Sequence, residues 1–195
     1  MRTLLFCLIF LMLSTSFAQD ANLSGVVKVE GDIVEDTRVG ILSIDRNGDF
    51  LGEVASVAPV GGTFSLDTAP VQSELIPFRS GSFLFPGLQN EYSVEPADAN
   101  YLAARVVPYV DVNTNAIFDG PAVDRSYIGI SSLEEPIGFF SLVYTDKTAT
   151  VAGKGAVLEF SPGWNIFTVR YPEEGDPIYA VEPAVDDVIL DVFLP

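Results

Sequence analysis

The segment that decides the fold class is Asp187-Val188-Ile189-Leu190-Asp191-Val192-Phe193-Leu194, near the C-terminal end of the chain. One side of this segment is apolar and consists of Val188, Leu190, Val192 and Leu194. The other side carries Asp187 and Asp191. Successive side chains of a β-strand point to opposite faces, so this period of two residues predicts a half-buried strand.

A second alternating segment runs from Trp164 to Tyr171, directly after the predicted turn Ser161-Pro162-Gly163. Its period of two residues places Phe167, Val169 and Tyr171 on one face. Thr168 and Arg170 fall on the opposite face. Trp164 has two possible roles, a platform for a carbohydrate ring or a packing residue, and its place at the start of a strand favours packing.

A hairpin is predicted around Asn47-Gly48, between apolar runs at residues 39–44 and 50–57. Asn and Gly both tolerate the positive φ that a two-residue type I′ turn requires, which makes this dipeptide the strongest short hairpin signal. Asp45, Asn47 and Asp49 also form a short D-x-N-x-D pattern that could hold an ion, but the hairpin accounts for it.

Further strands are predicted at residues 63–66, 103–112, 139–144 and 156–160, with Pro108 at a sheet edge or bulge. Residues 120–136 are predicted to be irregular, with Tyr127, Ile128 and Ile130 as their apolar anchors. No segment keeps an apolar period of 3.6 residues over the ten or more residues of a helix. The sequence thus predicts an all-β protein, an antiparallel β-sandwich with irregular loops and little or no helix. Residues 19–195 are expected to form one domain, and a split near residues 90–100 is the alternative.

The first third of the chain resembles the prealbumin-like β-sandwich repeats of carboxypeptidase regulatory-like domains. The matching residues are Gly25-Val26-Val27, residues 45–48 and Gly62-Thr63-Phe64-Ser65-Leu66. This resemblance implies a β-sandwich and a non-catalytic role. It transfers no functional residue.

Residues 1–18 have the pattern of a secretory signal peptide. A basic start at Met1-Arg2-Thr3 precedes an apolar run at residues 4–13, and the segment ends in the small-x-small pattern Ser16-Phe17-Ala18. The apolar run is shorter than the roughly 18 residues that a membrane-spanning helix needs. We therefore expect cleavage after Ala18 and a secreted or periplasmic bacterial protein, with an uncleaved anchor as the alternative.

Charge and cysteine content restrict the possible partners. Removing residues 1–18 takes away the only cysteine and one arginine, which leaves nine basic and 27 acidic residues, a net charge of −18. No disulfide is then possible. Such an acidic excess argues against nucleic acids and anionic membrane surfaces, which attract clusters of Lys and Arg. After removal of the signal peptide, no membrane span is expected.

The segment Asp111-Val112-Asn113-Thr114-Asn115-Ala116-Ile117-Phe118-Asp119 follows a predicted strand and carries oxygen-bearing side chains at alternate positions. Calcium takes six to eight oxygen ligands, and a loop of the form D-x-N-x-N directs alternate side chains and one backbone carbonyl toward a common centre. This segment therefore predicts a Ca²⁺ site. The alternative is an Asx-rich turn, in which Asp and Asn side chains bond to their own backbone.

The same segment resembles EF-hand loops, dockerin repeats and the D-x-N-x-N loops of bacterial surface β-domains. It departs from the EF-hand at Ala116, where that loop has glycine, and at Ala122, where a bidentate acid closes the shell. The resemblance implies a set of ligands consisting of Asp111, Asn113, Asn115, the carbonyl of Ile117, Asp119 and, two residues past the closing position, Asp124.

The residue inventory argues against catalysis. Histidine is absent, and the only cysteine lies in the predicted signal peptide, so His-based and thiol chemistry are excluded from the mature chain. Carboxylate pairs remain: Glu134-Glu135, Glu173-Glu174 and Asp186-Asp187. Adjacent residues of a strand point to opposite faces, so such pairs do not by themselves converge on a substrate. We therefore expect a non-catalytic module that binds an unknown protein or glycan of the cell envelope. The alternative is a carboxylate-dependent hydrolase of polysaccharides with a structural calcium ion.

Overall fold

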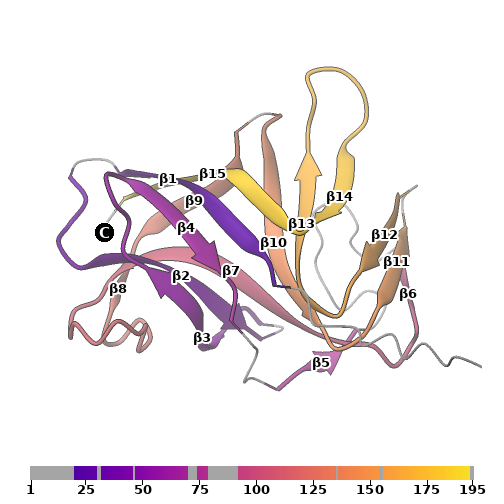
Figure 1. Ribbon diagram of the computed structural model, residues 1–195, viewed down its shortest axis with the longest axis horizontal. Helices are drawn as coiled ribbons and strands as arrows, with labels where there is room; N and C mark the ends of the chain where they lie inside the picture. Colours follow the sequence, from indigo (N-terminus) through magenta and orange to yellow (C-terminus); the bar gives the residue numbers. More distant parts are fainter. Residues whose placement is uncertain are drawn as a thin grey trace, which may run out of the picture.

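Figure 1 shows the computed structural model of the chain, which describes residues 20–29, 32–45, 47–69, 74–78, 92–134, 136–153 and 156–193. The predicted signal peptide at residues 1–18 and the apolar residue Leu194 lie outside the described residues. Within these residues every regular element is a β-strand and none is a helix, which confirms the all-β prediction.

Most of the strands belong to one large, strongly bent sheet. In order of neighbours, its main path is β3 (Phe50–Val57), β2 (Thr37–Ile44), β7 (Asn100–Val110), β10 (Gly138–Thr145), β9 (Ile128–Leu133), β15 (Ala184–Phe193), β1 (Asn22–Val29) and β4 (Thr63–Asp67). Beside this path, β13 (Gly163–Arg170) pairs with β10, β14 (Ile178–Glu182) pairs with β13, and β5 (Ile76–Pro77) and β8 (Arg125–Ser126) pair with β7. Because β3 and β4 contact each other at the two ends of the path, the sheet rolls around its inner face.

Among the strand pairs of the described chain, the pair of β1 and β15 is the parallel one, and the others are antiparallel. The alternation predicted for the C-terminal strand is confirmed, since Val188, Leu190 and Val192 are buried. These side chains belong to the core cluster inside the rolled sheet.

A second, three-stranded sheet packs against the outside of the large one. It consists of β12 (Ala156–Phe160), β11 (Ala149–Gly153) and β6 (Tyr92–Glu95). Its inward side chains, such as Val151 and Phe160, form a separate core cluster with Val143 of β10 and Phe167 of β13. The two sheets therefore share an apolar interface, as in a sandwich.

Strand β13 is covered on both faces. Trp164 and Ile166 lie in the core inside the rolled sheet, whereas Phe167 lies in the core under the three-stranded sheet. Trp164 is 1% exposed and donates from Nε1 to the carbonyl of Ala69 at 2.8 Å, so the packing role predicted for it is confirmed. Thr168, on the predicted polar face, is also buried and bonds to Glu182 at 2.7 Å.

The β2–β3 hairpin is confirmed, but the predicted type I′ turn is wrong. The backbone N–H of Gly48 donates to the carbonyl of Asp45 at 3.1 Å, and the N–H of Asp45 donates to the carbonyl of Asp49 at 2.9 Å. These bonds make the loop one residue longer than a two-residue turn, with Gly48 at φ 88°. The carboxylate of Asp45 stabilises the longer loop by accepting the N–H groups of Asn47 and Asp49, each at 2.8 Å.

The prediction of an irregular segment at residues 120–136 is also wrong. Strands β8 and β9 occupy much of it, and Ile128 and Ile130, the predicted anchors, are 54% and 62% exposed. Tyr127, the third predicted anchor, is buried as expected, and Leu133 is buried in place of the two isoleucines. The reason is the face of β9: Leu133 pairs with Val188 on the inner side of the sheet, whereas Ile128 and Ile130 point outward.

Pro108 does not lie on an edge strand, since β7 runs between β2 on one side and β10 and β8 on the other. The carbonyl of Pro108 accepts the N–H of Tyr127 at 3.0 Å, so this residue directs its backbone groups away from β2. The missing proline N–H thus removes no bond between β7 and β2. Pro108 lies between the part of β7 that pairs with β10 and the part that pairs with β8.

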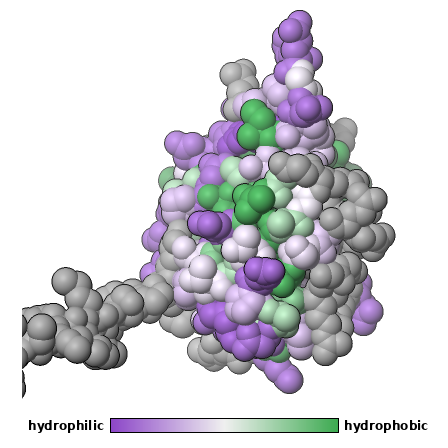
Figure 2. All heavy atoms as spheres, turned by 90° about the vertical axis from the view of Figure 1, so that its right-hand side faces the viewer, coloured by the Kyte–Doolittle hydropathy of each residue, from purple (hydrophilic) through white to green (hydrophobic). Residues whose placement is uncertain are grey.

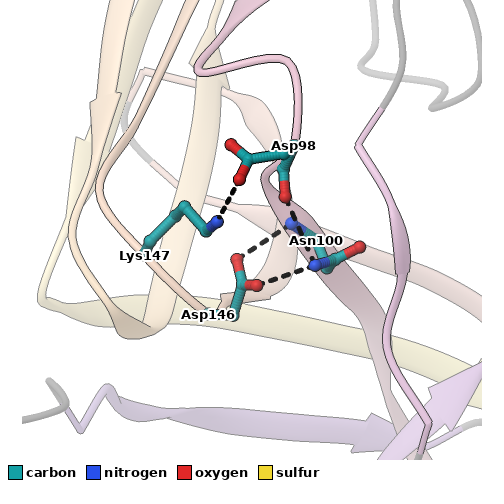
Figure 3. A network of polar contacts seen from close by, with 4 residues as sticks. All are labelled: Asp98, Asn100, Asp146 and Lys147. Carbon is teal, nitrogen blue, oxygen red and sulfur yellow. Dashed lines mark hydrogen bonds and ion pairs between the residues drawn. The ribbon is translucent and has the colours of Figure 1, made fainter.

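A polar network fixes the start of β7 to the turn between β10 and β11 (Figure 3). Asn100 donates its backbone N–H and its side-chain amide to the carboxylate of Asp146 at 2.9 and 2.7 Å. Lys147 donates to Asp98 at 2.9 Å, and this hydrogen bond lowers the pKa of the Asp98 carboxyl.

On another side of the molecule the β13–β14 hairpin projects from the body, and its end is hydrophilic (Figures 1 and 2).

Candidate functional site

The candidate calcium loop begins where β7 ends, and the adjoining β1–β2 connection holds its first residue. The N–H of Asp111 donates to the carbonyl of Asp36 at 3.0 Å, and the N–H of Thr114 donates back to the carbonyl of Asp111 at 3.3 Å. Thr114 and Ala116 have φ values of 57° and 64°. These left-handed conformations curl the loop tightly, and Ala116 adopts one where an EF-hand uses glycine.

Asp111 lies inside the loop and is 4% exposed. Its two carboxylate oxygens accept the backbone N–H groups of Asn115 at 3.2 Å and Ala116 at 2.6 Å. Each oxygen is therefore engaged by the loop, and each keeps a further lone pair for a cation.

Asp124 lies deeper still, at 1% exposure. One of its oxygens accepts the N–H of Val112 at 3.0 Å, and the other accepts the N–H of Asp119 at 2.7 Å. Asp124 thus ties the first part of the loop to its last residue. Of the six residues predicted to be ligands, Asp124 is the one whose position is best explained by hydrogen bonds to the backbone of the loop.

The side chains of Asn113, Asn115 and Asp119 converge on the exposed side of the loop. Both amide groups donate to the same carboxylate oxygen, Oδ2 of Asp119, at 2.7 Å. The amide oxygen of Asn113 accepts only a long bond of 3.4 Å from the N–H of Asn115, whereas that of Asn115 accepts the N–H of Ile117 at 2.8 Å. Ile117 is 53% exposed.

Glu53 of β3 anchors the loop to the sheet, although the sequence pattern gave no indication of it. Its Oε2 accepts the hydroxyl of Tyr109 at 2.8 Å and the backbone N–H of Phe118 at 3.0 Å. Burial, together with the hydrogen bond to Glu53, raises the pKa of Tyr109 from 10.0 to about 12, against the lowering effect of the Ser56 hydroxyl. Glu53 and Phe118 are separated by 65 residues, so no local spacing points to this contact.

The donor set of the loop consists of oxygen atoms, which is the chemistry that Ca²⁺ prefers. In the described part of the chain, no three His, Cys, Asp or Glu side chains are grouped so that they alone could hold a metal ion. A cation here needs the amide and carbonyl oxygens as well as the carboxylates. Turning the amide of Asn113 to present its oxygen gives up its 2.7 Å bond to Asp119 and a 3.4 Å bond from the N–H of Asn115. Turning that of Asn115 gives up bonds of 2.7 and 2.8 Å.

The carboxylate pairs considered for catalysis do not converge where the structure describes them. Asp186 is exposed, whereas Asp187 accepts two bonds from the guanidinium of Arg170 at 2.6 and 3.1 Å. Glu173 and Glu174 are exposed in the projecting β13–β14 hairpin. Glu135 lies outside the described residues.

Within the described residues, no helix has the length and apolar character that crossing a membrane requires.

No protein-family model matches this chain, and neither a curated protein nor a solved structure shows significant similarity to it. The resemblances to regulatory-like domains and to EF-hand or dockerin loops therefore stay predictions, and the function has to be argued from the residues themselves.

Proposed function

We propose that this protein is a non-catalytic, exported β-sandwich module whose loop at residues 111–119 is stabilised by calcium. The observation that carries the proposal is the convergence of Asn113 and Asn115 on one oxygen of Asp119, at 2.7 Å each, in an exposed part of the loop. The buried carboxylates of Asp111 and Asp124 hold the backbone beneath.

The electrostatics of the chain support a cation at this loop. Asp111, Asp119 and Asp124 lie within 14 residues of a chain that carries a net charge of −17, and hydrogen bonds from neutral amides do not cancel their charge. A divalent cation does. Because the loop commits few formal charges and several neutral oxygens, we expect a dissociation constant of about 10⁻⁴ to 10⁻³ M, the range of extracellular calcium modules.

Thermal unfolding tests the proposal. At a calcium concentration ten times the dissociation constant, an ion that binds only the folded state stabilises it by about 1.4 kcal/mol. For a domain of this size, the melting temperature then rises by roughly 3 to 5 °C. Magnesium raises it much less, because Mg²⁺ dehydrates reluctantly and demands a tighter octahedron. Equal melting temperatures in EDTA and in several millimolar calcium would show that the loop is only an Asx-rich turn.

The role we infer for the module is binding or structural support at the bacterial cell envelope, with a protein or glycan of the envelope as partner. Support comes from the signal-peptide pattern at residues 1–18 and from the acidic excess. Mass spectrometry of the native protein should find Gln19 at its N-terminus, and an intact Met1 would contradict export by this route.

A further inference from the structure

A hollow of about 280 Å³ opens on the outer face of β2 and β7, between the β2–β3 turn and the end of the candidate calcium loop. Leu42, Phe50, Val107 and Phe118 supply its apolar lining. Arg105 and Ser126 are among its polar residues. This volume lies at the lower end of the roughly 300 to 1,000 Å³ of small-molecule sites, which suits a ligand of about one aromatic ring with a small polar group.

The apolar wall of the hollow is built before any ligand arrives. Phe118 is 4% exposed and packs against Phe50 and Tyr109, with ring centroids 4.9 and 5.1 Å apart in edge-to-face geometry. The hydrogen bond from its backbone N–H to Glu53 fixes it to β3. A ligand therefore meets a rigid apolar surface, and little conformational entropy is lost on binding.

The guanidinium of Arg105 lies at the rim of this hollow. Arg105 is exposed, and across the described residues its side chain makes no hydrogen bond and no ion pair. Other basic residues are engaged: Lys147 bonds to Asp98, and Arg38 bonds to Ser56. A Cβ atom placed on Gly48 would lie 3.7 Å from Nη2 of Arg105, so the guanidinium reaches the β2–β3 turn.

An arginine side chain with no partner among the described residues is unexpected, because acidic residues outnumber basic ones by 27 to 10 in the sequence. Asp49 lines the same hollow and still does not pair with Arg105. A guanidinium has a planar fork of N–H donors that matches a carboxylate. The net negative charge opposes binding of a bare anion, so the ligand also needs an apolar group that the wall of the hollow can cover.

We infer that this hollow binds a carboxylate attached to an apolar group, with Arg105 on the carboxylate and the Phe50–Phe118 wall on the apolar part. Free aryl carboxylates and the C-terminal residue of a polypeptide both present this chemistry. The inference deepens the proposed binding role, but the site itself does not require calcium.

A titration followed by ¹H–¹⁵N correlation spectra of the full mature chain tests the inference. The probes are phenylacetate for a free acid, acetyl-Ala-Phe for a C-terminal carboxylate, and acetyl-Ala-Phe-amide and acetate as controls. We expect phenylacetate, acetyl-Ala-Phe or both to shift the amide signals of Gly48, Val107 and Phe118. The amide and acetate should shift them at least tenfold less at equal concentration, because each lacks one half of the ligand.

The matched variants are Arg105→Gln and Lys28→Gln. Lys28 is exposed on β1, and its side chain also makes no hydrogen bond or ion pair in the described chain, so both changes remove one positive charge. Arg105→Gln should weaken binding by about tenfold or more, as expected for loss of a charge-assisted bond, and Lys28→Gln should not. If the spectrum of Arg105→Gln shows misfolding, Arg105→Lys replaces it and should weaken binding several-fold, because lysine lacks the planar fork.

The inference is overturned if neither carboxylate shifts these signals, or if acetate or the amide shifts them equally. It is also overturned if binding is unchanged in the Arg105 variant or is lost equally in the Lys28 variant. The titration is run in EDTA and in calcium. Failure of the carboxylates to bind leaves the calcium-dependent melting shift intact, whereas failure of calcium binding leaves the carboxylate titration in EDTA intact, so the two proposals fail separately.

Discussion

The buried carboxylate of Asp124 accepts the backbone N–H of Asp119 at 2.7 Å, so a residue at 1% exposure holds the last residue of the candidate calcium loop. The residues predicted to be ligands thus fall into two groups. Asp111 and Asp124 support the loop from inside, whereas Asn113, Asn115 and Asp119 meet on its exposed side. Substitutions in the two groups should have different effects.

The change Asp124→Ala should destabilise the protein by about 2 to 4 kcal/mol in EDTA and in calcium alike. It removes two partly buried, charge-assisted hydrogen bonds, from the N–H groups of Val112 and Asp119, and bonds to charged groups contribute about 1.5 to 3 kcal/mol each, less where water can replace them. Urea unfolding measures the difference. A loss that appears only in calcium would mean that Asp124 acts as a ligand and not as a support for the backbone.

The change Asp119→Ala should remove the calcium-dependent rise in melting temperature and alter the stability in EDTA by less than about 1 kcal/mol, because its hydrogen bonds are exposed. The matched control is Asp32→Ala, which removes the same charge from an exposed position in the β1–β2 connection. The control should keep the full calcium response. If both variants lose it equally, the response reflects the general negative charge of the chain and not this loop.

The change Ala116→Gly should stabilise the protein by roughly 0.5 to 1 kcal/mol. A left-handed conformation, here at φ 64°, costs a non-glycine residue about 1 to 2 kcal/mol, and the greater freedom of glycine in the unfolded chain cancels about half of the gain. Ala122→Gly, at a neighbouring residue without positive φ, should destabilise the protein. Equal effects of the two changes in denaturant unfolding would contradict the strain at Ala116.

Raising the pH from 10 to 12 should destabilise the protein through Tyr109. Its pKa is about 12 in the folded chain and near 10 when unfolded. The folded state therefore keeps a proton that the unfolded state releases, so this contribution is complete below pH 10 and is lost as the pH approaches 12. Tyr109→Phe should flatten the pH dependence of stability in this range. In this variant, absorbance at 295 nm should show one tyrosine fewer that ionises near pH 12.

Local patterns in the sequence were enough to predict most strands. The two-residue alternation at Val188, Leu190 and Val192 depends only on neighbouring residues, and those side chains are buried as expected. The β2–β3 hairpin was predictable for the same reason. Its turn type was not, because the Asp45 carboxylate, and not the Asn47-Gly48 pair alone, determines how the loop closes.

Other features depend on contacts between distant residues, which local patterns do not contain. Ile128 and Leu133 are both apolar, and only the pairing of β9 with β15 determines that Leu133 faces inward. Similarly, the D-x-N-x-N spacing identified the candidate loop at residues 111–119. The anchoring of this loop by Glu53 depends on β3 lying beside it, which the spacing does not indicate. The division of the predicted ligands into buried and exposed groups also follows from the tertiary structure.

The parallel pairing of β1 and β15 bears on how the protein responds to mechanical force. The start of β1 at Asn22 and the end of β15 at Phe193 lie at opposite ends of this strand pair, because the strands run in the same direction. Tension applied to both ends of the chain therefore acts along the strands and loads their hydrogen bonds together in shear. A protein attached to its surroundings through both ends would carry tension through this pair without being peeled open strand by strand.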